Sequence, residues 1–315
     1  MNKQNILITV IGATAIGKTA LSIALAKHYN CEIVSCDSRQ FFKEMTIGTA
    51  VPSNYELSEA QHHFIQNKSI HEKYSVGDFE KEGLNKLDAL FLKNNIQIAV
   101  GGSGLYINSL ASGLDHFPAI DINVREQVRH NFERFGIREL QEKLKNLDPD
   151  YYTYLTSYNP QTLQNPQRLM RFLEVCISAN QPYSTYLNKN KTPRNFKTIY
   201  IGLEADRVIM YDRINARVDQ MLKNGLLDEA ASLYSYKHLN ALQTVGYKEI
   251  FNFIDGQYQL PDAIEEIKKN TRRFAKRQIT WFKRTDNVHW FDCNIEVKFI
   301  IEKINFAIKK SASID

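Results

Sequence analysis

Short apolar runs alternate with helical patterns along the first hundred residues of the chain. Mostly apolar runs cover residues 6–11, 32–36 and 96–100, and each is short enough for one buried strand. Residues 18–29 and 78–93 have the apolar spacing of helices. Strands that alternate with helices are typical of a parallel sheet. We therefore predict an α/β fold built on a doubly wound parallel sheet.

The middle of the chain has a different pattern. Six of the eight prolines lie between Pro118 and Pro193, and no strand pattern is found there. Helical spacing recurs over residues 123–134, 138–147 and 167–180. We predict a small all-helical domain at 119–197, inserted into a core domain that is formed by 1–118 and 198–315.

Strand and helix patterns return after this insertion. Residues 198–203 and 288–291 are typical of strands, so they are expected to complete the sheet. Helices are expected over residues 206–224, 226–236 and 261–284.

The composition is that of a globular protein, with 43% hydrophobic and 24% charged residues. No apolar run approaches the ~20 residues that a membrane-spanning helix needs, so we expect no membrane partner. A net charge of +5 is only mildly basic, so the placement of the charges carries more information than their sum.

The cysteines and histidines give no metal signature. The four cysteines are scattered without a C-x-x-C pair, so reduced thiols in a cytoplasmic protein are expected. His62, His63 and His71 are close in sequence, but neighbouring histidines rarely converge on one metal, and we predict no zinc site. Residues 3–15 imitate a short signal peptide, but a phosphate-binding motif overlaps them, so secretion is not expected.

That motif is GATAIGKT at residues 12–19, which matches the phosphate-binding pattern G-x-x-x-x-G-K-[ST]. It lies between a strand and a helix, as the pattern requires. Loop amides and the helix N-terminus attract phosphate, Lys18 adds a full positive charge, and the Thr19 hydroxyl can bind Mg²⁺. We therefore predict Mg²⁺ as a cofactor. The predicted phosphate-binding residues are Gly12, Ala13, Thr14, Ala15, Ile16, Gly17, Lys18 and Thr19.

Two further segments should reach the same edge of the sheet. Asp37 follows the second strand, and Gly-Gly-Ser-Gly at 101–104 follows the third. The carboxyl ends of parallel strands open on one edge, so both segments should face the phosphate loop. Asp37 could be a general base, an indirect Mg²⁺ ligand or a helix cap. Ser103 offers a hydroxyl, and the glycines could admit a ligand or serve a tight turn.

The helix expected at 261–284 is strongly basic. Residues 268–284 hold eight Lys or Arg and no acid. We predict that an apolar seam of this helix packs on the core while basic rims face nucleic-acid phosphates, although a simple solvated face is the alternative. The seam residues are Phe274, Ile279, Trp281 and Phe282. Arg168 and Arg171 in the insertion favour a basic channel between the two domains.

Ten motifs along the chain resemble those of the bacterial tRNA dimethylallyltransferases, also called tRNA isopentenyltransferases. They are GATAIGKT (12–19), CDSRQFF (36–42), IGTAVP (47–52), HHF (62–64), YSVGDF (74–79), GGSGLY (101–106), NPQRLMRFLEV (165–175), RINARVDQML (213–222), QTVGYKEI (243–250) and TRRFAKRQITWFKR (271–284). There are departures: Ala13, Ile16 and Phe42 replace a common Pro, Ser and Tyr. Ser103 replaces a Thr but keeps the hydroxyl. Pro166 replaces an Asp, which leaves the cap of that helix open.

The resemblance implies a P-loop NTPase-like fold and one reaction. A dimethylallyl group would pass from dimethylallyl diphosphate to N6 of the adenosine that is 3′-adjacent to the anticodon in tRNA, and diphosphate would leave. The loop would then hold a substrate diphosphate, although its pattern alone is typical of nucleotide and ATP binding. The resemblance implies Asp37 as the general base, with Ser103 and Arg217 also catalytic. Arg213, four residues earlier, is the alternative to Arg217.

The resemblance also implies contacts with the tRNA anticodon stem-loop. A base in a single-stranded loop can leave its stack and enter a pocket, where Ser38, Arg39 and Gln40 could recognise it. The expected tRNA-binding residues are Asp37, Ser38, Arg39, Gln40, Ser103, Arg125, Gln167, Arg168, Leu169, Met170, Arg171, Gly246, Tyr247 and Lys248. We expect a cytoplasmic monomer.

Three other functions compete with this one. A small-molecule kinase would use the same loop for ATP, and ATP hydrolysis or transfer would distinguish it. An enzyme that prenylates free adenine nucleotides would need neither the insertion nor the basic helix. A tRNA-binding protein without catalysis would not need Lys18, Thr19 and Asp37 together.

Overall fold

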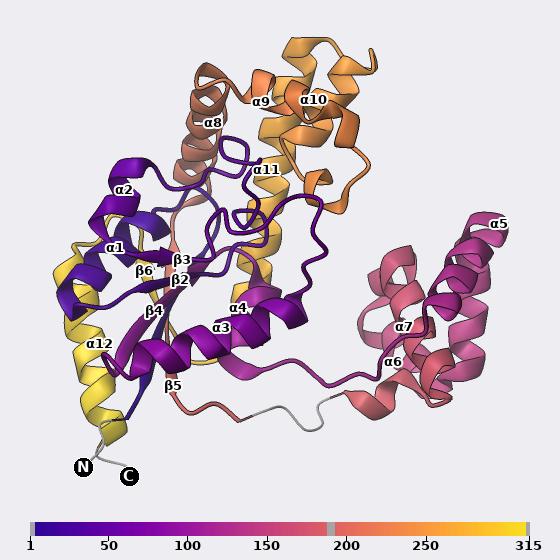
Figure 1. The fold of residues 1–315 in the computed structure, drawn as a ribbon, viewed down its shortest axis with the longest axis horizontal. Helices are drawn as coiled ribbons and strands as arrows, with labels where there is room; N and C mark the ends of the chain where they lie inside the picture. The colour runs from indigo at the N-terminus through magenta and orange to yellow at the C-terminus, as the bar shows by residue number, and fades with distance from the viewer. Residues whose placement is uncertain (1–3, 188–192, 313–315) are drawn as a thin grey trace. The chain divides into compact units, whose positions relative to one another are not determined.

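The structure is a computed structural model that describes residues 4–187 and 193–312. The chain forms two compact units (Figure 1). One consists of Met1–Ser112 with Arg194–Asp315, and the other of Gly113–Pro193. The insertion therefore begins at 113 and ends at 193, where the sequence predicted 119 and 197. The two units are described separately below.

The larger unit is built on a six-stranded parallel sheet with the strand order β3-β2-β4-β1-β5-β6. The strands are β1 (Ile6–Gly12), β2 (Ile33–Ser35), β3 (His62–His63), β4 (Ile96–Gly101), β5 (Lys197–Glu204) and β6 (Val288–Asp292). This confirms the predicted α/β fold class. β3 was not predicted, because a strand of two residues leaves no alternation to detect.

Helices cover both faces of this sheet (Figure 1). α1 (Lys18–Tyr29) and α12 (Val297–Ala312) pack on one face, and α3 (Val76–Phe91), α4 (Gly104–Ser112) and the end of α11 (Leu260–Phe282) pack on the other. The other helices described in this unit are α2 (Asn54–Glu59), α8 (Arg207–Lys223), α9 (Leu226–Ser232) and α10 (Tyr247–Ile254). Short 3₁₀ turns lie at Tyr234–Tyr236 and Asn240–Leu242.

The central strand β1 divides the core between the two faces. Ile6, Ile8 and Val10 pack into one apolar cluster with α1 and α12, whereas Leu7 and Ile11 pack into another with α3, α4 and α11. Every residue of β1 is buried. A buried aliphatic side chain contributes about 1.5–3 kcal/mol, so this strand anchors the phosphate loop that follows it.

A third apolar cluster joins the helices beyond the sheet. It brings together side chains of α8, α9, α10 and α11 and residues of the loops after β2 and β3, among them Val218, Tyr247, Ile267 and Phe42. This cluster fixes α8 and α11 in place. Both helices supply residues to the site described below.

The smaller unit is helical in the part that the structure describes, residues 113–187 and 193. It contains α5 (Ile122–Leu147), α6 (Pro149–Tyr158), α7 (Pro166–Ala179) and 3₁₀ turns at Pro160–Gln164 and Tyr183–Tyr186. α5 is interrupted at Gly136, which has φ 74° and ψ −167°, and this confirms the two helices predicted at 123–134 and 138–147. α6 was not predicted.

Two side-chain caps hold the helices of this unit. The buried Asp148 carboxylate accepts hydrogen bonds from the N–H of Tyr151 at 3.1 Å and from the N–H of Ser184 at 2.7 Å. Asn165 caps α7 by accepting from the Arg168 N–H at 3.1 Å, with Pro166 as the first helical residue. The cap that Pro166 left open in the sequence is therefore Asn165.

Candidate functional site

The phosphate loop joins the end of β1 to the start of α1. Gly12 has φ 149°, and a Cβ added there would lie 2.7 Å from the carbonyl oxygen of Leu203 in β5. Only glycine fits this close approach between the loop and the neighbouring strand. The loop amides are thereby held at the N-terminus of α1, where the helix dipole favours an anion.

Lys18 places a poorly hydrated cation in this loop. Its Nζ donates to the carbonyl oxygen of Ala13 at 2.7 Å. Burial, and to a lesser extent the nearby Arg217 cation, lower the pKa of Lys18 to about 8 against the opposing effect of the Asp37 carboxylate. A diphosphate would replace the lost water around this ammonium.

Two cavities open beside the loop, and all the residues that line them belong to the larger unit. The first, which we call the loop cavity, has a volume of about 560 Å³ and is lined by Ala15, Lys18 and Thr19 among others. The second, the helix cavity, has a volume of about 790 Å³ and is lined by residues of α8, α10 and α11. Both volumes are typical of ligand sites. The residues that line both cavities are Thr14, Asp37, Thr49, Ala50, Gly102, Arg217, Phe274 and Gln278.

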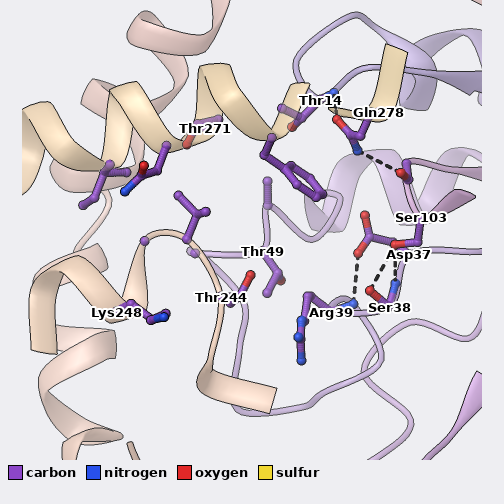
Figure 2. Close-up of a pocket in the computed structure, with 18 of the residues that line it drawn as sticks. Thr14, Asp37, Ser38, Arg39, Thr49, Ser103, Thr244, Lys248, Thr271 and Gln278 are labelled. Atoms are coloured by element: carbon purple, nitrogen blue, oxygen red, sulfur yellow. Dashed lines mark hydrogen bonds between the residues drawn. The ribbon is translucent and has the colours of Figure 1, made fainter. Parts of the chain in front are cut away.

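Asp37 lies where the two cavities adjoin. Its Oδ1 accepts a hydrogen bond from the N–H of Arg39 at 3.0 Å, which fixes the carboxylate at the end of β2 (Figure 2). Within residues 4–187 and 193–312, no hydrogen-bond donor engages the other oxygen, Oδ2. An anchored carboxylate with one uncommitted oxygen can accept a proton from a ligand in either cavity.

Ser103 holds the residue next to Asp37. Its Oγ accepts from the N–H of Ser38 at 3.1 Å and donates to the Ser38 hydroxyl at 3.0 Å (Figure 2). Ser103 therefore positions the end of β2 in this structure, and the catalytic role suggested by the resemblance stays a prediction.

Arg213 and Arg217, one turn apart on α8, have different surroundings. Arg213 donates to Asn294 Oδ1 at 2.8 Å and to the carbonyl oxygen of Ile16 at 3.4 Å, so it ties the phosphate loop to the segment after β6. In the described part of the chain, Arg217 has neither an ion pair nor a side-chain hydrogen bond. Burial lowers the pKa of Arg217, against the opposing field of Asp37. The geometry thus leaves Arg217, rather than Arg213, available to an anion.

Helix α11 closes the site through close packing on the turn after β4. The Gln278 side chain accepts from the Thr14 N–H at 2.8 Å and donates to the Gly102 carbonyl oxygen at 2.9 Å. A Cβ on Gly102 would overlap Gln278, and a Cβ on Gly104 would overlap the Trp281 ring. These two glycines therefore allow α11 to pack closely against the turn after β4. The sequence had suggested that they make room for a ligand or form a tight turn.

Sequence reasoning missed Gln278. A single glutamine in a basic helix carries no motif of its own. The only signal is its spacing, because it lies between the buried Ala275 and Phe282 on one face of α11.

The predicted apolar seam of α11 is wrong in part. Phe282 is fully buried and Ile279 half-buried, but Phe274 and Trp281 are 39% and 38% exposed and line the helix cavity. The buried face is completed by small or polar residues, Ala263, Ala275 and Gln278, because α11 lies directly against the glycine turn. Its two exposed aromatic rings thus belong to the cavity.

The basic residues of α11 are partly neutralised. Lys268 pairs with Asp219 at 2.8 Å, Lys269 pairs with Glu266, and Lys283 pairs with Glu204 at 2.7 Å. The other five cations have no ion pair in the described ranges. Arg272 donates to Asn215 Oδ1 at 2.8 Å, and Arg273, Lys276, Arg277 and Arg284 remain for phosphate.

Arg39 and Gln40 shape the cavity walls through backbone carbonyls. Arg39 Nη1 donates to the carbonyl oxygens of Asn240 and Ala241 at 2.9 and 3.1 Å. Gln40 Nε2 donates to the carbonyl oxygen of Ala50 at 2.9 Å and lines the loop cavity. Recognition of a base by these two residues stays a prediction.

Tyr247, one of the expected tRNA-binding residues, has a buried side chain, and its contact with tRNA stays a prediction. Its side chain is fully buried, and its hydroxyl donates to Glu229 Oε1 at 2.6 Å. Burial and the adjoining Glu229 carboxylate raise the pKa of Tyr247, so the phenol stays a donor. The neighbouring Gly246 and Lys248 line the helix cavity.

The smaller unit presents most of its expected tRNA residues on its surface. Arg125, Gln167 and Arg168 are exposed, and Met170 and Arg171 are half-buried. Leu169 is fully buried in the helical core, so its side chain is not presented on the surface, and its part in tRNA binding stays a prediction. It faces inward because it packs with Phe172 and Leu173 on one side of α7.

The loop cavity also fits the predicted Mg²⁺. The Thr19 hydroxyl and the carboxylates of Asp37 and Glu56 line it, and Mg²⁺ prefers such oxygen ligands. Among the described residues, no group of three or more His, Cys, Asp or Glu could hold a metal alone. The residues therefore suit a Mg²⁺ that is bound together with phosphate oxygens.

Comparison with known proteins agrees with this architecture. The model of the IPP transferase family matches residues 40–285. This chain belongs to that family. It is 65% identical to a tRNA dimethylallyltransferase of Flavobacterium psychrophilum over 97% of this chain and 100% of that protein. It is 63% identical to a tRNA dimethylallyltransferase of Flavobacterium johnsoniae, over 97% and 99% of the two chains.

Solved structures of IPP transferase relatives share the fold. A tRNA isopentenylpyrophosphate transferase of Bacillus halodurans matches with a TM-score of 0.73 and 32% identity, over 99% of each chain. A eukaryotic dimethylallyltransferase described as acting on tRNA matches with a TM-score of 0.75 and 27% identity, over 92% of this chain and 74% of that one. The predicted P-loop NTPase-like fold class is confirmed. Among the described helices, none is long and apolar enough to cross a membrane.

Proposed function

We propose that this chain transfers a dimethylallyl group from dimethylallyl diphosphate to N6 of the adenosine 3′ to the anticodon in tRNA. The names of relatives that are 63–65% identical over nearly the whole chain support the reaction. The observation that carries the mechanism is the position of Asp37 and Arg217 at the junction of the loop cavity and the helix cavity. One cavity takes the donor and the other takes the acceptor base.

The diphosphate of the donor occupies the loop cavity in this proposal. Negative charge grows on it as the carbon–oxygen bond breaks, so groups that bind the product anion lower the barrier. Loop amides, Lys18 and Arg217 supply that field. Thr19 would hold Mg²⁺ together with the diphosphate, and the bound ion would supply Lewis-acid stabilisation of the leaving group.

The acceptor amine needs a base at the junction. The lone pair of an adenine N6 is delocalised into the ring, which makes the amine a weak nucleophile. Asp37 Oδ2 takes the N6 proton as the new nitrogen–carbon bond forms, and the electron pair of the broken bond leaves with the diphosphate. The Ser38–Ser103 hydrogen bonds keep the carboxylate in place.

The helix cavity suits a base taken out of its stack. Its walls carry the rings of Phe274 and Trp281, on which a base can stack, and Arg277 lies beside them. In the smaller unit, the exposed Arg125, Gln167 and Arg168 are proposed to contact the tRNA backbone. Because tRNA is the substrate, we place the enzyme in the cytoplasm, and we propose that it acts as a monomer.

Mass spectrometry of tRNA nucleosides tests the function. Unmodified tRNA is incubated with dimethylallyl diphosphate and Mg²⁺, and digestion should yield N6-dimethylallyladenosine with the wild-type protein. Asp37→Ala should yield none while it still binds tRNA. Asp286→Ala, an exposed carboxylate outside both cavities, is the matched control and should act as the wild type does. Absence of product with the wild type, or transfer of phosphate from ATP instead, would contradict the proposal.

A further inference from the structure

Gln278 has an unusual position for a polar side chain. It lies on the buried face of α11 and is only 6% exposed. Both ends of its amide are used: Oε1 accepts from the Thr14 N–H at 2.8 Å, and Nε2 donates to the Gly102 carbonyl oxygen at 2.9 Å. One side chain from α11 thus satisfies a donor and an acceptor that lie on two different strand ends.

The two segments that Gln278 joins carry the two halves of the chemistry. Thr14 belongs to the phosphate loop after β1. Gly102 precedes Ser103, whose hydroxyl bonds Ser38, and Ser38 follows Asp37 directly. Figure 2 shows this run of hydrogen bonds from Gln278 to the turn after β4, and from Ser103 to Ser38 beside Asp37. A continuous set of bonded groups therefore connects the phosphate loop with the proposed base.

The fit around Gln278 allows no looser arrangement. A Cβ on Gly102 would overlap the Gln278 amide nitrogen. Ala275 and Phe282, one turn to either side, are fully buried and fix the height of the helix above the sheet. A side chain of another length at 278 would leave the Thr14 N–H or the Gly102 carbonyl without a partner. An unpaired buried polar group destabilises the structure around it.

We propose that Gln278 is a positioning residue that holds the phosphate loop and Asp37 at the separation that prenyl transfer needs. This inference rests on the function proposed above. The donor carbon is placed by the loop, and the amine is placed by Asp37. A displacement of about 1 Å between reacting groups can cost about a hundredfold in rate.

Gln278→Met tests the proposal, because methionine has a similar length but neither hydrogen bond. We expect kcat to fall about ten- to a hundredfold and the KM for dimethylallyl diphosphate to rise several-fold, whereas the dissociation constant for tRNA stays within about twofold. Thr280→Ala is the control on the same helix. Its hydroxyl is exposed and bonds only the Lys276 carbonyl, so no change is expected.

Gly102→Ala tests the same contact from the other side. Its new methyl group would displace the Gln278 amide and reproduce the defect. In the double variant Gly102→Ala/Gln278→Ala the methyl group meets no amide, so the loss should equal that of Gln278→Ala alone. Strict additivity of the two losses would contradict a shared mechanism.

Calorimetry with inorganic diphosphate separates this inference from the proposed function, because it needs no turnover. Gln278→Met, measured at a temperature at which circular dichroism shows it fully folded, should bind diphosphate several-fold more weakly than the wild type. Wild-type kcat and wild-type diphosphate affinity in that variant would overturn the inference. The inference would also be overturned if the loss of rate in Gln278→Met were no larger than the loss of folded protein. A wild-type protein that binds diphosphate but makes no prenylated tRNA would overturn the function instead.

Discussion

At the residue scale, the three cations around the loop cavity differ in what else they bind. Arg213 is occupied by Asn294 and the Ile16 carbonyl, and Lys18 by the Ala13 carbonyl. Arg217 has no such partner in the residues that the structure describes. Arg217 is therefore the cation best able to bind the negative charge that develops on a leaving diphosphate.

Arg213 and Arg217 form a matched pair for mutation. Arg217→Ala should lower kcat about a hundredfold or more, because removing one donor to a developing anion typically costs that much. Arg213→Ala should lower the melting temperature by a few degrees and kcat less than about tenfold, since it removes contacts of the loop and not of the anion. Steady-state kinetics with saturating tRNA measures both. A larger loss of kcat in the Arg213 variant would reverse the assignment.

The lowered pKa of Lys18 predicts how binding of the dimethylallyl donor depends on pH. Its pKa of about 8 in the folded protein is below the ordinary 10.5, so it is protonated below pH 8 and releases its proton above. Binding of dimethylallyl diphosphate then requires proton uptake, and the affinity should fall by up to about tenfold per pH unit above 8. Calorimetric titration between pH 7 and 9.5 measures this. Lys18→Arg, whose guanidinium stays charged, should show a flat profile; the same fall in that variant would exclude Lys18 as the cause.

The same shift has a consequence for folding. Since the folded pKa lies below the unfolded one, the unfolded chain binds more protons between pH 8 and 10.5. Lys18 therefore destabilises the fold fully below pH 8, and its contribution becomes more favourable as the pH rises through that window.

The chemistry of single residues was predictable where a motif states it and unpredictable where only packing does. GATAIGKT identified Lys18 and Thr19 from type and spacing alone. Asp37 was found because parallel strands end on one edge. No motif marks Tyr247 and Leu169 as buried or Gln278 as part of the site, because each depends on which face of its helix packs against which neighbour.

At the element scale, one carboxylate organises the loop that forms part of both cavity walls. Glu229 of α9 accepts hydrogen bonds from the N–H groups of Thr46, Ile47 and Gly48 at 2.8–3.0 Å and from the Tyr247 hydroxyl. This loop continues into Thr49 and Ala50, which line both cavities.

Glu229→Ala should lower the free energy of unfolding by about 2–4 kcal/mol, because three backbone donors and a phenol lose a charged acceptor. Tyr247→Phe removes one of these four bonds and should cost about 1 kcal/mol. Urea denaturation followed by circular dichroism measures both. Equal losses in the two variants would show that the loop amides gain little from Glu229.

Some long amphipathic elements were predictable, but the 16-residue α12 was missed, as were several short elements. α8 and α11 were found within a few residues of their ends. α10 has eight residues and β3 has two, too few for a period to emerge. The exposed face of α11 was predicted wrongly because Phe274 and Trp281 are typical core residue types, whereas their side chains are 39% and 38% exposed in the structure.

At the scale of the whole molecule, residues 268–284 form a dense run of positive charge, with eight of the 40 Lys and Arg of the chain and no acid. Arg273, Lys276 and Arg277 on α11, and Arg284 just after its end, have no ion pair in the part of the chain that the structure describes. A polyanion bound there releases counterions, whereas a small diphosphate in the loop cavity is held by fixed donors.

Salt should therefore separate the two substrates. Raising the KCl concentration from 50 to 200 mM should weaken tRNA binding by at least about tenfold and change the KM for dimethylallyl diphosphate much less. Filter binding at several salt concentrations measures the slope. The double variant Lys276→Ala/Arg277→Ala should make that slope shallower by about one to two units. If the tRNA affinity of the wild type does not change with salt concentration, a contact between α11 and the tRNA phosphate backbone is contradicted.

The domain organisation was visible in the sequence because composition changes sharply at the insertion. Six prolines and the loss of strand patterns marked it, although the boundaries at 113 and 193 differ from the predicted 119 and 197. The boundaries were less accurate because the linking segments carry no periodic pattern of their own.

The position of the insertion also affects how the chain is synthesised. β1 lies in the middle of the sheet between β4 and β5, yet β5 follows the insertion. After β4 ends at Gly101, 95 residues must be made before β5 begins at Lys197. This takes roughly 5–19 s at ordinary rates of translation, and the edge of β1 stays unpaired during that time. During that interval the half-sheet exposes unpaired backbone groups that another strand could capture. We therefore expect chaperones to bind the nascent chain until β5 emerges and pairs with β1.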